Sequence, residues 1–249
     1  IFRGRYDHQG ALVRFGGRLM GTYGRESIAK LLADELVIIL QARQAAVYLP
    51  SEEDKSYIRY GASGATHGSL PVVLEEENML LRTVLTKRIA VLKDEIYHLH
   101  TSSRAEINSM LQTFESLDAV VAYPLATQEH IHGIVFLGDK SNDNAYTSDE
   151  LTLLGALLSQ AGVALDNTWL YEEIVGAQKH YEIILRHMQR GVLAVDSSLV
   201  VKTLNEMGAR ILGVDQDDCI GKLAPALLPP FADLLQKTLD EGRNQPSLE

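Results

Sequence analysis

The sequence contains a single cysteine, Cys219, among its 249 residues. One thiol cannot form an internal disulfide, and it cannot supply a cluster of thiolate ligands for a metal. The composition is therefore typical of a reducing compartment, and we expect the chain to be cytoplasmic. We expect Cys219 itself to be a small buried residue.

Positive charge is also scarce. Lys and Arg together number 23, against 33 Asp and Glu, which gives a net charge of -10 at pH 7. Nucleic-acid affinity depends largely on clustered Lys and Arg that neutralise backbone phosphates, and the sequence contains no basic stripe. We therefore expect no nucleic-acid partner.

Long apolar runs are missing too. The stretch LVIIL at 36 to 40 is far shorter than the roughly 18 residues that a membrane-spanning helix needs, and no charged-then-apolar leader opens the chain. We expect no membrane contact within this chain. The first residue is Ile1 rather than Met, so we expect a piece of a longer protein, which leaves room for a membrane anchor elsewhere in the parent protein.

The chain is rich in apolar residues, which make up 46% of it, and it is long enough for two ordinary domains. Its apolar spacing alternates between the periods of helix and strand. A Gly-rich loop is expected between the second and third strands. The predicted helices and strands of the first part are helices at 26–41, 79–85 and 105–117, and strands at 45–49, 57–62, 70–74, 89–92, 119–127 and 131–138.

The segment GDKSNDNAYTSDE, residues 138 to 150, allows two interpretations. Read as a twelve-residue loop, it spaces oxygen-bearing side chains much as an EF-hand does. Those side chains belong to Asp139, Ser141, Asp143, Thr147 and Glu150. An EF-hand also needs an entering helix and a glycine at its sixth position, whereas here a strand enters and an asparagine takes that place. We therefore interpret the segment as a structural turn and assign no metal site.

The same segment carries a start signal for a long helix. Thr147 followed three residues later by Glu150 forms a capping box. Apolar residues then recur at helical spacing from Leu151 to Leu165, after which a five-residue step to Leu170 rotates the stripe by roughly 140°. We predict a continuous helix whose second stripe forms a homodimer seam; the alternative is a broken helix packed on the next domain. The seam residues are Leu170, Ile174, Ala177, Tyr181, Ile184 and Met188.

The pattern restarts after Arg190. Two short strands, at 191–197 and 199–205, form a tight hairpin, and a short helix at 206–213 follows. An acidic turn at 215–218 and an amphipathic helix at 230–239 complete the predicted elements. If this second part forms a sheet, we expect most of its strands to lie outside this chain.

Two runs of sequence resemble known signalling modules. GIVFLGDKSNDNAYTSDELTLLGALLSQAGVALDN, residues 133–167, resembles the closing segment of a GAF domain. RGVLAVDSSLVVKTLNEMGARILGVDQDDCIGK, residues 190–222, resembles the first half of a PAS domain, with Asn205 opening the helix after the hairpin. Their succession across a helical linker resembles bacterial sensor histidine kinases.

The resemblance implies an α+β fold with four regions. These are an N-terminal leader or linker helix (1–19), a GAF domain with an antiparallel sheet flanked by helices (20–170), a signalling helix (171–189) and the N-terminal part of a truncated PAS domain (190–249). It implies the sensory input region of a two-component kinase, itself without catalytic residues, which binds an unknown small-molecule effector or partner. The alternatives are a transcriptional regulator, a cyclic-dinucleotide enzyme or a ligand-free dimerisation scaffold.

The resemblance also indicates candidate site residues. Strand position suggests Val121, Tyr123 and Phe136 for the effector pocket between the sheet and one helical layer. A cyclic-nucleotide-binding subset of the family pairs a lysine with an aspartate, which here implies an ion pair of Lys140 with Asp149.

Several other chemistries have no support in the sequence. The GAF part lacks the cysteines that methionine sulfoxide reduction or bilin attachment requires, and the sequence calls for no cofactor. His130 and His132 flank the predicted hairpin turn, and we assign them no function.

Overall fold

The computed structural model describes residues 2–51, 53–64, 70–98 and 103–227, and beyond these residues 229, 233, 236 and 237; side chains are described except those of residues 2–8, 98, 177, 178, 182 and 227. The chain divides into two compact units, residues 1–171 and 172–249. Helices and strands are mixed in both units, which confirms the predicted α+β class.

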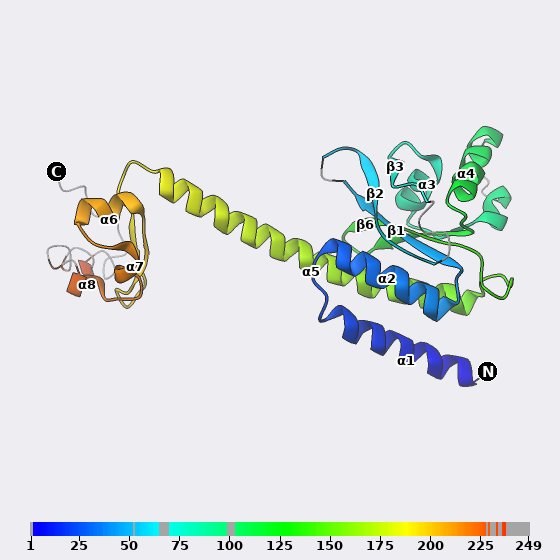
Figure 1. The fold of residues 1–249 in the computed structure, drawn as a ribbon, viewed down its shortest axis with the longest axis horizontal. Coiled ribbons are helices and arrows are strands. Elements are labelled where there is room, and N and C mark those ends of the chain that lie inside the picture. Colours follow the sequence, from blue (N-terminus) through cyan, green and yellow to red (C-terminus); the bar gives the residue numbers. More distant parts are fainter. Residues whose placement is uncertain are drawn as a thin grey trace. The chain divides into compact units, whose positions relative to one another are not determined.

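The first unit is built on a six-stranded sheet in the order β3-β2-β1-β6-β5-β4 (Figure 1). Every neighbouring pair runs antiparallel. The predicted strands at 45–49 and 57–62 pair as a hairpin, and so do those at 119–127 and 131–138. The strands are β1 (Gln44–Pro50), β2 (Ser56–Gly64), β3 (Val73–Glu75), β4 (Val91–Leu92), β5 (Val121–Ala126) and β6 (Ile131–Leu137).

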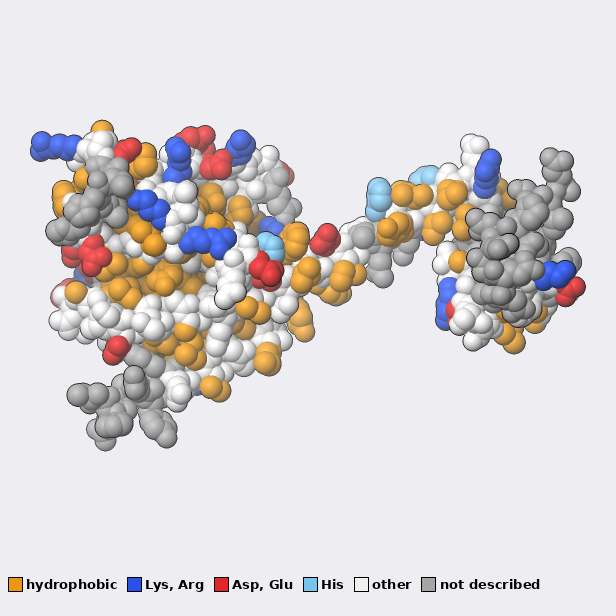
Figure 2. Space-filling view, turned by 180° about the vertical axis from the view of Figure 1, so that it is seen from behind, with side chains coloured by type: hydrophobic (Ala, Val, Ile, Leu, Met, Phe, Trp, Pro, Cys, Tyr) orange, Lys and Arg blue, Asp and Glu red, His pale blue; other side chains and the backbone are white. Residues whose placement is uncertain are grey.

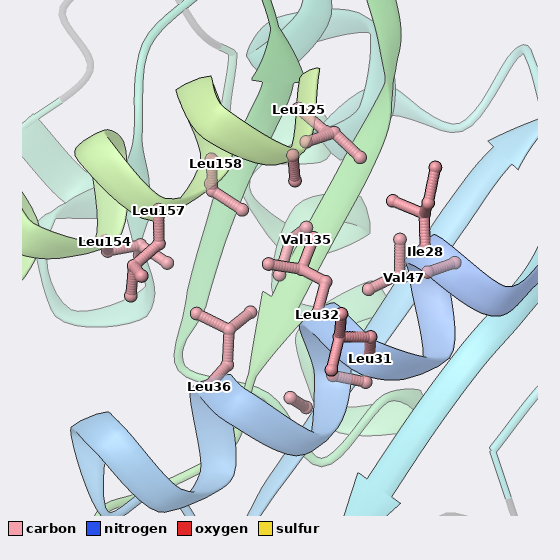
Figure 3. Close-up of a cluster of buried hydrophobic side chains, with 14 of the residues drawn as sticks. Ile28, Leu31, Leu32, Leu36, Val47, Leu125, Val135, Leu154, Leu157 and Leu158 are labelled. Atoms are coloured by element: carbon pink, nitrogen blue, oxygen red, sulfur yellow. The ribbon is translucent and has the colours of Figure 1, made fainter. Parts of the chain in front are cut away.

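Helices cover both faces of this sheet, and each layer has its own apolar core. One face packs against α1 (Phe2–Leu19), α2 (Arg25–Leu40) and the first part of α5 (Ser148–His187). The other packs against α3 (Met79–Lys87), the 3-10 helix η2 (Lys93–His98) and α4 (Arg104–Ser116). Figure 3 shows leucines of α2 and α5 converging over Val47 and Val135 of the sheet. Burial on both faces explains why β5 and β6 are apolar along most of their length.

Side-chain caps fix where the helices begin. The side chain of Asn78 accepts hydrogen bonds from the backbone N–H groups of Leu80 and Leu81 at the start of α3. At α4, Ser103 and Glu106 form a capping box. Each cap satisfies donors that the first turn leaves without intrahelical partners.

Gly61 allows α2 to lie unusually close to β2. A Cβ atom at this position would stand 2.2 Å from the carbonyl oxygen of Ala29 and 2.8 Å from the amide nitrogen of Lys30. Gly61 and Gly64 both belong to β2, so the strand continues two residues beyond its predicted end. The rest of the expected Gly-rich loop lies outside the described residues. The glycine serves helix packing here, because no side chain fits.

Helix α5 is continuous over 40 residues, as predicted. Thr147 and Glu150 form the expected capping box: the Thr147 N–H donates to Oε2 of Glu150 at 2.9 Å, and the Glu150 N–H donates to Oγ1 of Thr147 at 3.3 Å. Leucines of its first part are buried against the sheet. Among the described residues, no helix combines the length and apolar character needed to cross a membrane.

The second unit contains a two-stranded antiparallel sheet of β7 (Leu193–Val195) and β8 (Val201–Leu204), followed by α6 (Glu206–Leu212). The predicted acidic turn is instead a short helix, α7 (Gln216–Cys219), because Asp215 caps it by accepting from two backbone N–H groups. Cys219 is buried, as expected. Helix α8 (Ala224–Leu227) follows. The helix predicted at 230–239 lies largely outside the described residues.

Candidate functional site

In the segment with EF-hand spacing, residues 138 to 150, the ammonium group of Lys140 lies beside a carboxylate oxygen. Nζ of Lys140 lies 2.6 Å from Oε1 of Glu150, and the lysine side chain is buried. The other carboxylate oxygen of Glu150 caps α5. Asp143 pairs instead with Arg43. Within the described part of the chain, no group of three or more His, Cys, Asp or Glu residues is arranged to hold a metal ion. Lys140 thus ties this segment to the first turn of α5.

Lys140 does form the expected kind of ion pair, but its partner is Glu150 rather than the predicted Asp149. Asp149 is exposed on the first turn of α5. Burial by itself would raise the pKa of Glu150, but hydrogen bonds from Lys140 and Thr147 outweigh it and lower the pKa below its ordinary value. Glu150 thus anchors the start of α5 to Lys140, in the segment that follows β6.

The three predicted pocket residues do not share one face of the sheet. Val121 is buried in the layer of α2 and α5, and Tyr123 packs against that same layer. Phe136 is buried on the opposite face, under α3 and α4. Antiparallel pairing places Val121 opposite Leu137 and leaves Phe136 opposite Ala122, so Phe136 faces away from the other two.

The layer beneath α3 and α4 is filled by large side chains. Tyr48 and Phe136 meet edge to face, with ring centroids 5.7 Å apart. The Tyr48 hydroxyl donates a 2.6 Å hydrogen bond to the carbonyl oxygen of Pro71, and burial, partly offset by Arg59, raises the pKa of Tyr48 to about 12. Met110 and Phe114 of α4 are fully buried against them. Among the described residues, large core side chains therefore pack together in this layer.

A cavity of about 180 Å³ lies elsewhere in the first unit, beside α5. Its lining comes from four separate places in the sequence: the start of α2, the end of β1, the β5–β6 hairpin and the middle of α5. The lining residues are Arg25, Leu49, Pro50, His130, Ile131, His132, Leu165, Asp166 and Trp169.

Two imidazoles converge on one carboxylate in this cavity. Nδ1 of His130 lies 2.9 Å from Oδ1 of Asp166, within hydrogen-bonding distance. Nε2 of His132 lies 3.1 Å from the same oxygen, yet it is buried without a properly directed hydrogen-bond partner. The His130 ring also contacts the indole of Trp169, with centroids 5.7 Å apart. The hairpin and α5 therefore meet through polar and aromatic groups at one point.

Burial lowers the pKa of His132 from its ordinary value of 6.5. The negative charge of Asp166 opposes this effect without cancelling it, while His130 and Arg25 act in the same direction as burial. His132 is therefore neutral at pH 7, and a neutral imidazole can accept or donate at Nε2 according to its tautomer.

Sequence reasoning missed this cavity. Its one local signal is the His-x-His spacing of His130 and His132, since alternate residues of an extended strand point to the same side. Nothing in the sequence places Asp166 or Arg25 beside them, because those contacts depend on how α2 and α5 pack.

Comparison with known families identifies the first unit. The GAF domain model matches residues 24–165, more than half of the chain. The chain belongs to the GAF domain family. A second model, the PAS fold, matches residues 179–247. The order of GAF and then PAS confirms the resemblance noted in the sequence.

Solved structures share the GAF fold at low sequence identity. A methyl-accepting chemotaxis protein fragment (residues 122 to 287) is 15% identical with a TM-score of 0.52, covering 64% of this chain and 98% of that one. The phycoerythrobilin-bound GAF domain of a cyanobacterial phytochrome gives 15% and 0.52, covering 66% and 97%. The GAF domain of the Acinetobacter phosphoenolpyruvate-protein phosphotransferase gives 12% and 0.50, covering 65% and 94%. No curated protein matches the chain.

Beyond the GAF domain, α5 exposes large apolar side chains (Figure 2). Of the predicted seam residues, Ile174 and Tyr181 are 60% and 66% exposed, and Leu170, Ile184 and Met188 are also exposed. The side chain of Ala177 is outside the described set. Trp169, Tyr171 and Ile183 add to this apolar surface on other sides of the helix.

In the PAS unit, Asn205 ties the end of α5 to the domain that follows. Its side-chain amide donates to the carbonyl oxygens of Leu185 and Arg190, and its side-chain oxygen accepts from the N–H groups of Val192 and Gly208. Asn205 is buried. One side chain thus joins α5, the segment just before β7, and α6, and the sequence motif had placed it at the start of α6.

Proposed function

We propose that this chain is the sensory input region of a bacterial two-component sensor histidine kinase, and that it relays effector binding through a dimeric α5. The succession of GAF and PAS domains supports a role in signalling. The similar folds in a chemotaxis protein and a phytochrome agree with it. In this proposal the catalytic domains belong to the parent protein, and this chain acts in the cytoplasm.

The observation that carries the proposal is the apolar stripe on the second part of α5. Leu170, Ile174, Tyr181, Ile184 and Met188 recur at steps that keep one side of a helix in register, and all are exposed. Exposed apolar residues at this spacing are typical of a helix that pairs with a second helix. In a parallel homodimer the same residues of two copies would face each other.

Helix α5 can relay a signal because each of its two ends is bonded to a domain. Helix α5 is anchored to the GAF sheet by its buried leucines, and Asn205 bonds its other end to the PAS unit. An effector with different affinities for two arrangements of the paired helices would shift the population between them. The PAS unit would then pass that shift to the output domains.

Disulfide trapping tests the dimer directly. In a Cys219→Ala background, Ile174→Cys and Tyr181→Cys should each form covalent dimers under mild oxidation, because seam residues of a parallel pair lie within disulfide reach. Lys179→Cys is the matched control, since Lys179 is exposed on the opposite side of the same helix. Monomers throughout, or equal trapping at Lys179, would count against the proposal.

A ligand-free dimerisation scaffold is the second candidate. The packing of Tyr48, Phe136, Met110 and Phe114 favours it, because these described core side chains lie together beneath α3 and α4. Both candidates predict trapping at Ile174. They differ in whether a small molecule changes the trapping rate, which only the sensor predicts.

A further inference from the structure

We propose that Asn167 fixes the alignment of the paired α5 helices, so that two copies of this chain join in parallel and in register. The proposal rests on the dimer proposed above and names the residue that selects its geometry. The exposed stripe of α5 begins before Leu170 and contains one amide side chain. That side chain decides which alignments of two identical helices are favourable.

Heptad spacing extends the exposed stripe toward the GAF domain. Counting back from Leu170 in the same alternation of three and four residues gives Asn167 and Val163, and both are exposed. Val163 is 52% exposed although it lies among leucines that are buried against the sheet. The next position, Gln160, is partly covered, and a Cβ atom at Gly16 of α1 would stand 3.5 Å from its Oε1. The exposed stripe therefore begins at Val163.

The longer stripe has the length and the outer face of a two-stranded coiled coil. From Val163 to Met188 it covers almost four heptads, whereas the part from Leu170 onward covers fewer than three. Three to four heptads of this spacing indicate a coiled coil. On the opposite side of the helix, exposed charged residues recur at intervals of one heptad. They are Glu172, Lys179 and Arg186.

Asn167 is the single amide in the stripe. The other positions are apolar or aromatic: Val163, Leu170, Ile174, Ala177, Tyr181, Ile184 and Met188. An amide enclosed between two helices loses its water, so it needs a hydrogen-bonding partner there. In a parallel pair in register, Asn167 faces Asn167 of the other copy, and a carboxamide can both donate to and accept from its twin. A second copy of this chain is therefore the partner that suits the stripe.

The position of Asn167 near one end of the stripe penalises other alignments. An antiparallel pair that overlaps over the whole stripe would place Asn167 opposite Ile184. A parallel pair shifted by one heptad would place it opposite Ile174. Either arrangement buries an amide against an apolar side chain, which costs free energy. Asn167 thus lowers the affinity of the dimer and raises its specificity.

Disulfide trapping between two different cysteine variants reports the alignment. In a Cys219→Ala background, chains with Leu170→Cys are mixed with tagged chains that carry Tyr181→Cys. An antiparallel pair brings these positions together, whereas a parallel pair in register keeps them about 16 Å apart along the helix, beyond the roughly 7 Å reach of a disulfide. Chains with Ile174→Cys, mixed with the same tagged chains, report the shift by one heptad.

Chains with the native Asn167 should give homotypic disulfide dimers and few mixed ones. Asn167→Leu should raise the mixed fraction about ten-fold, because the wrong alignments no longer bury an amide. In chains without the added cysteines, it should also lower the dimer dissociation constant about ten-fold in sedimentation equilibrium, the weight of one buried amide. Lys179→Leu adds the same apolar group on the opposite side of α5 and should change neither quantity. Damage to the fold cannot produce a tighter dimer.

The role of Asn167 is overturned if homotypic dimers form but the mixed fraction in Asn167→Leu stays at the native level, or if Asn167→Leu weakens the dimer. In that case the proposed dimer stands and only its register determinant falls. If no homotypic dimer forms at Leu170, Ile174 or Tyr181 in either background, the dimer and the role of Asn167 both fail.

Discussion

From Ser148 to Leu165, α5 points leucines such as Leu154 and Leu157 into the GAF core, where they are fully buried. From Asp166 to His187, the same helix carries apolar side chains of similar size that face solvent, among them Ile174 and Tyr181. The period is helical in both parts, so the period alone does not decide burial. The five-residue step between the stripes turns the apolar side away from the sheet, and the second stripe is then left to another partner.

The largest expected effect distinguishes these two parts of α5. Leu157→Ala should lower the free energy of unfolding by about 2–5 kcal/mol, because it removes buried methyl groups and leaves a cavity. The loss should not depend on protein concentration. Ile174→Ala should weaken only the dimer, so its effect should vanish on dilution. Urea unfolding at two protein concentrations measures the effect of each substitution. If Ile174→Ala lowered stability equally at both concentrations, the two parts of α5 would not differ in the way described.

Two glycine-to-alanine substitutions compare the packed GAF core with the exposed part of α5. Gly61→Ala should destabilise the GAF domain by roughly 1–3 kcal/mol, because the new methyl group would collide with the backbone of α2. Gly176→Ala, in the exposed part of α5, meets nothing within 4 Å and should raise helix stability by about 1 kcal/mol. Thermal unfolding followed by circular dichroism reports both changes. A tolerated Gly61→Ala would mean that α2 lies farther from β2.

At the start of the buried part, Lys140→Met tests the anchor on Glu150. We expect a loss of about 1 kcal/mol, at the lower end for a charged hydrogen bond because Glu150 is partly exposed. The pKa of Glu150 is lowered in the folded state, so the contribution is complete above the ordinary value of 4.5 and disappears as pH falls through the lower folded value. The two proteins should therefore converge in stability in acid.

The control for Lys140→Met is Lys179→Met, on the exposed part of α5. It should change the free energy of unfolding little at any pH. A constant difference between the wild type and Lys140→Met down to strongly acid pH would show that the lysine acts by packing rather than by its charge.

The smallest effect on stability is expected from His132, which lies beside Asp166 where the two parts of α5 meet. The folded-state pKa of His132 lies below 6.5, so the unfolded chain binds more protons as pH falls below that value, and the stability of the free protein should fall with it. His132→Gln should flatten this slope in urea unfolding between about pH 7 and pH 5. His187→Gln, exposed near the end of α5, should leave the slope unchanged.

Local signals predicted much of the architecture. Helical spacing and the Thr147–Glu150 capping box predicted α5, and short apolar runs rich in strand-forming residues predicted the strands of the main sheet. Each of these signals depends only on residues that are close together in the chain, so it can be recognised from the sequence. The acidic composition of residues 215–218 suits a turn as well as the start of a helix, so the sequence predicts a turn there. The hydrogen bonds that Asp215 accepts at the start of α7 favour the helix.

Contacts between distant segments were harder to foresee. The faces of Val121 and Phe136 depend on the register of β5 against β6, which a one-residue shift would reverse. Lys140 could reach either Asp149 or Glu150, and the capping geometry selects Glu150. The cavity around Asp166 needs four segments to pack together, and the sequence reveals only the His-x-His spacing.

The mass of the chain in solution tests the central claim most directly, that the exposed stripe of α5 joins two copies. Sedimentation equilibrium at micromolar concentration should give twice the 27.5 kDa of one chain, and Ile174→Lys should return the mass to that of one chain. A wild-type protein that stays at 27.5 kDa over the whole concentration range would contradict the account.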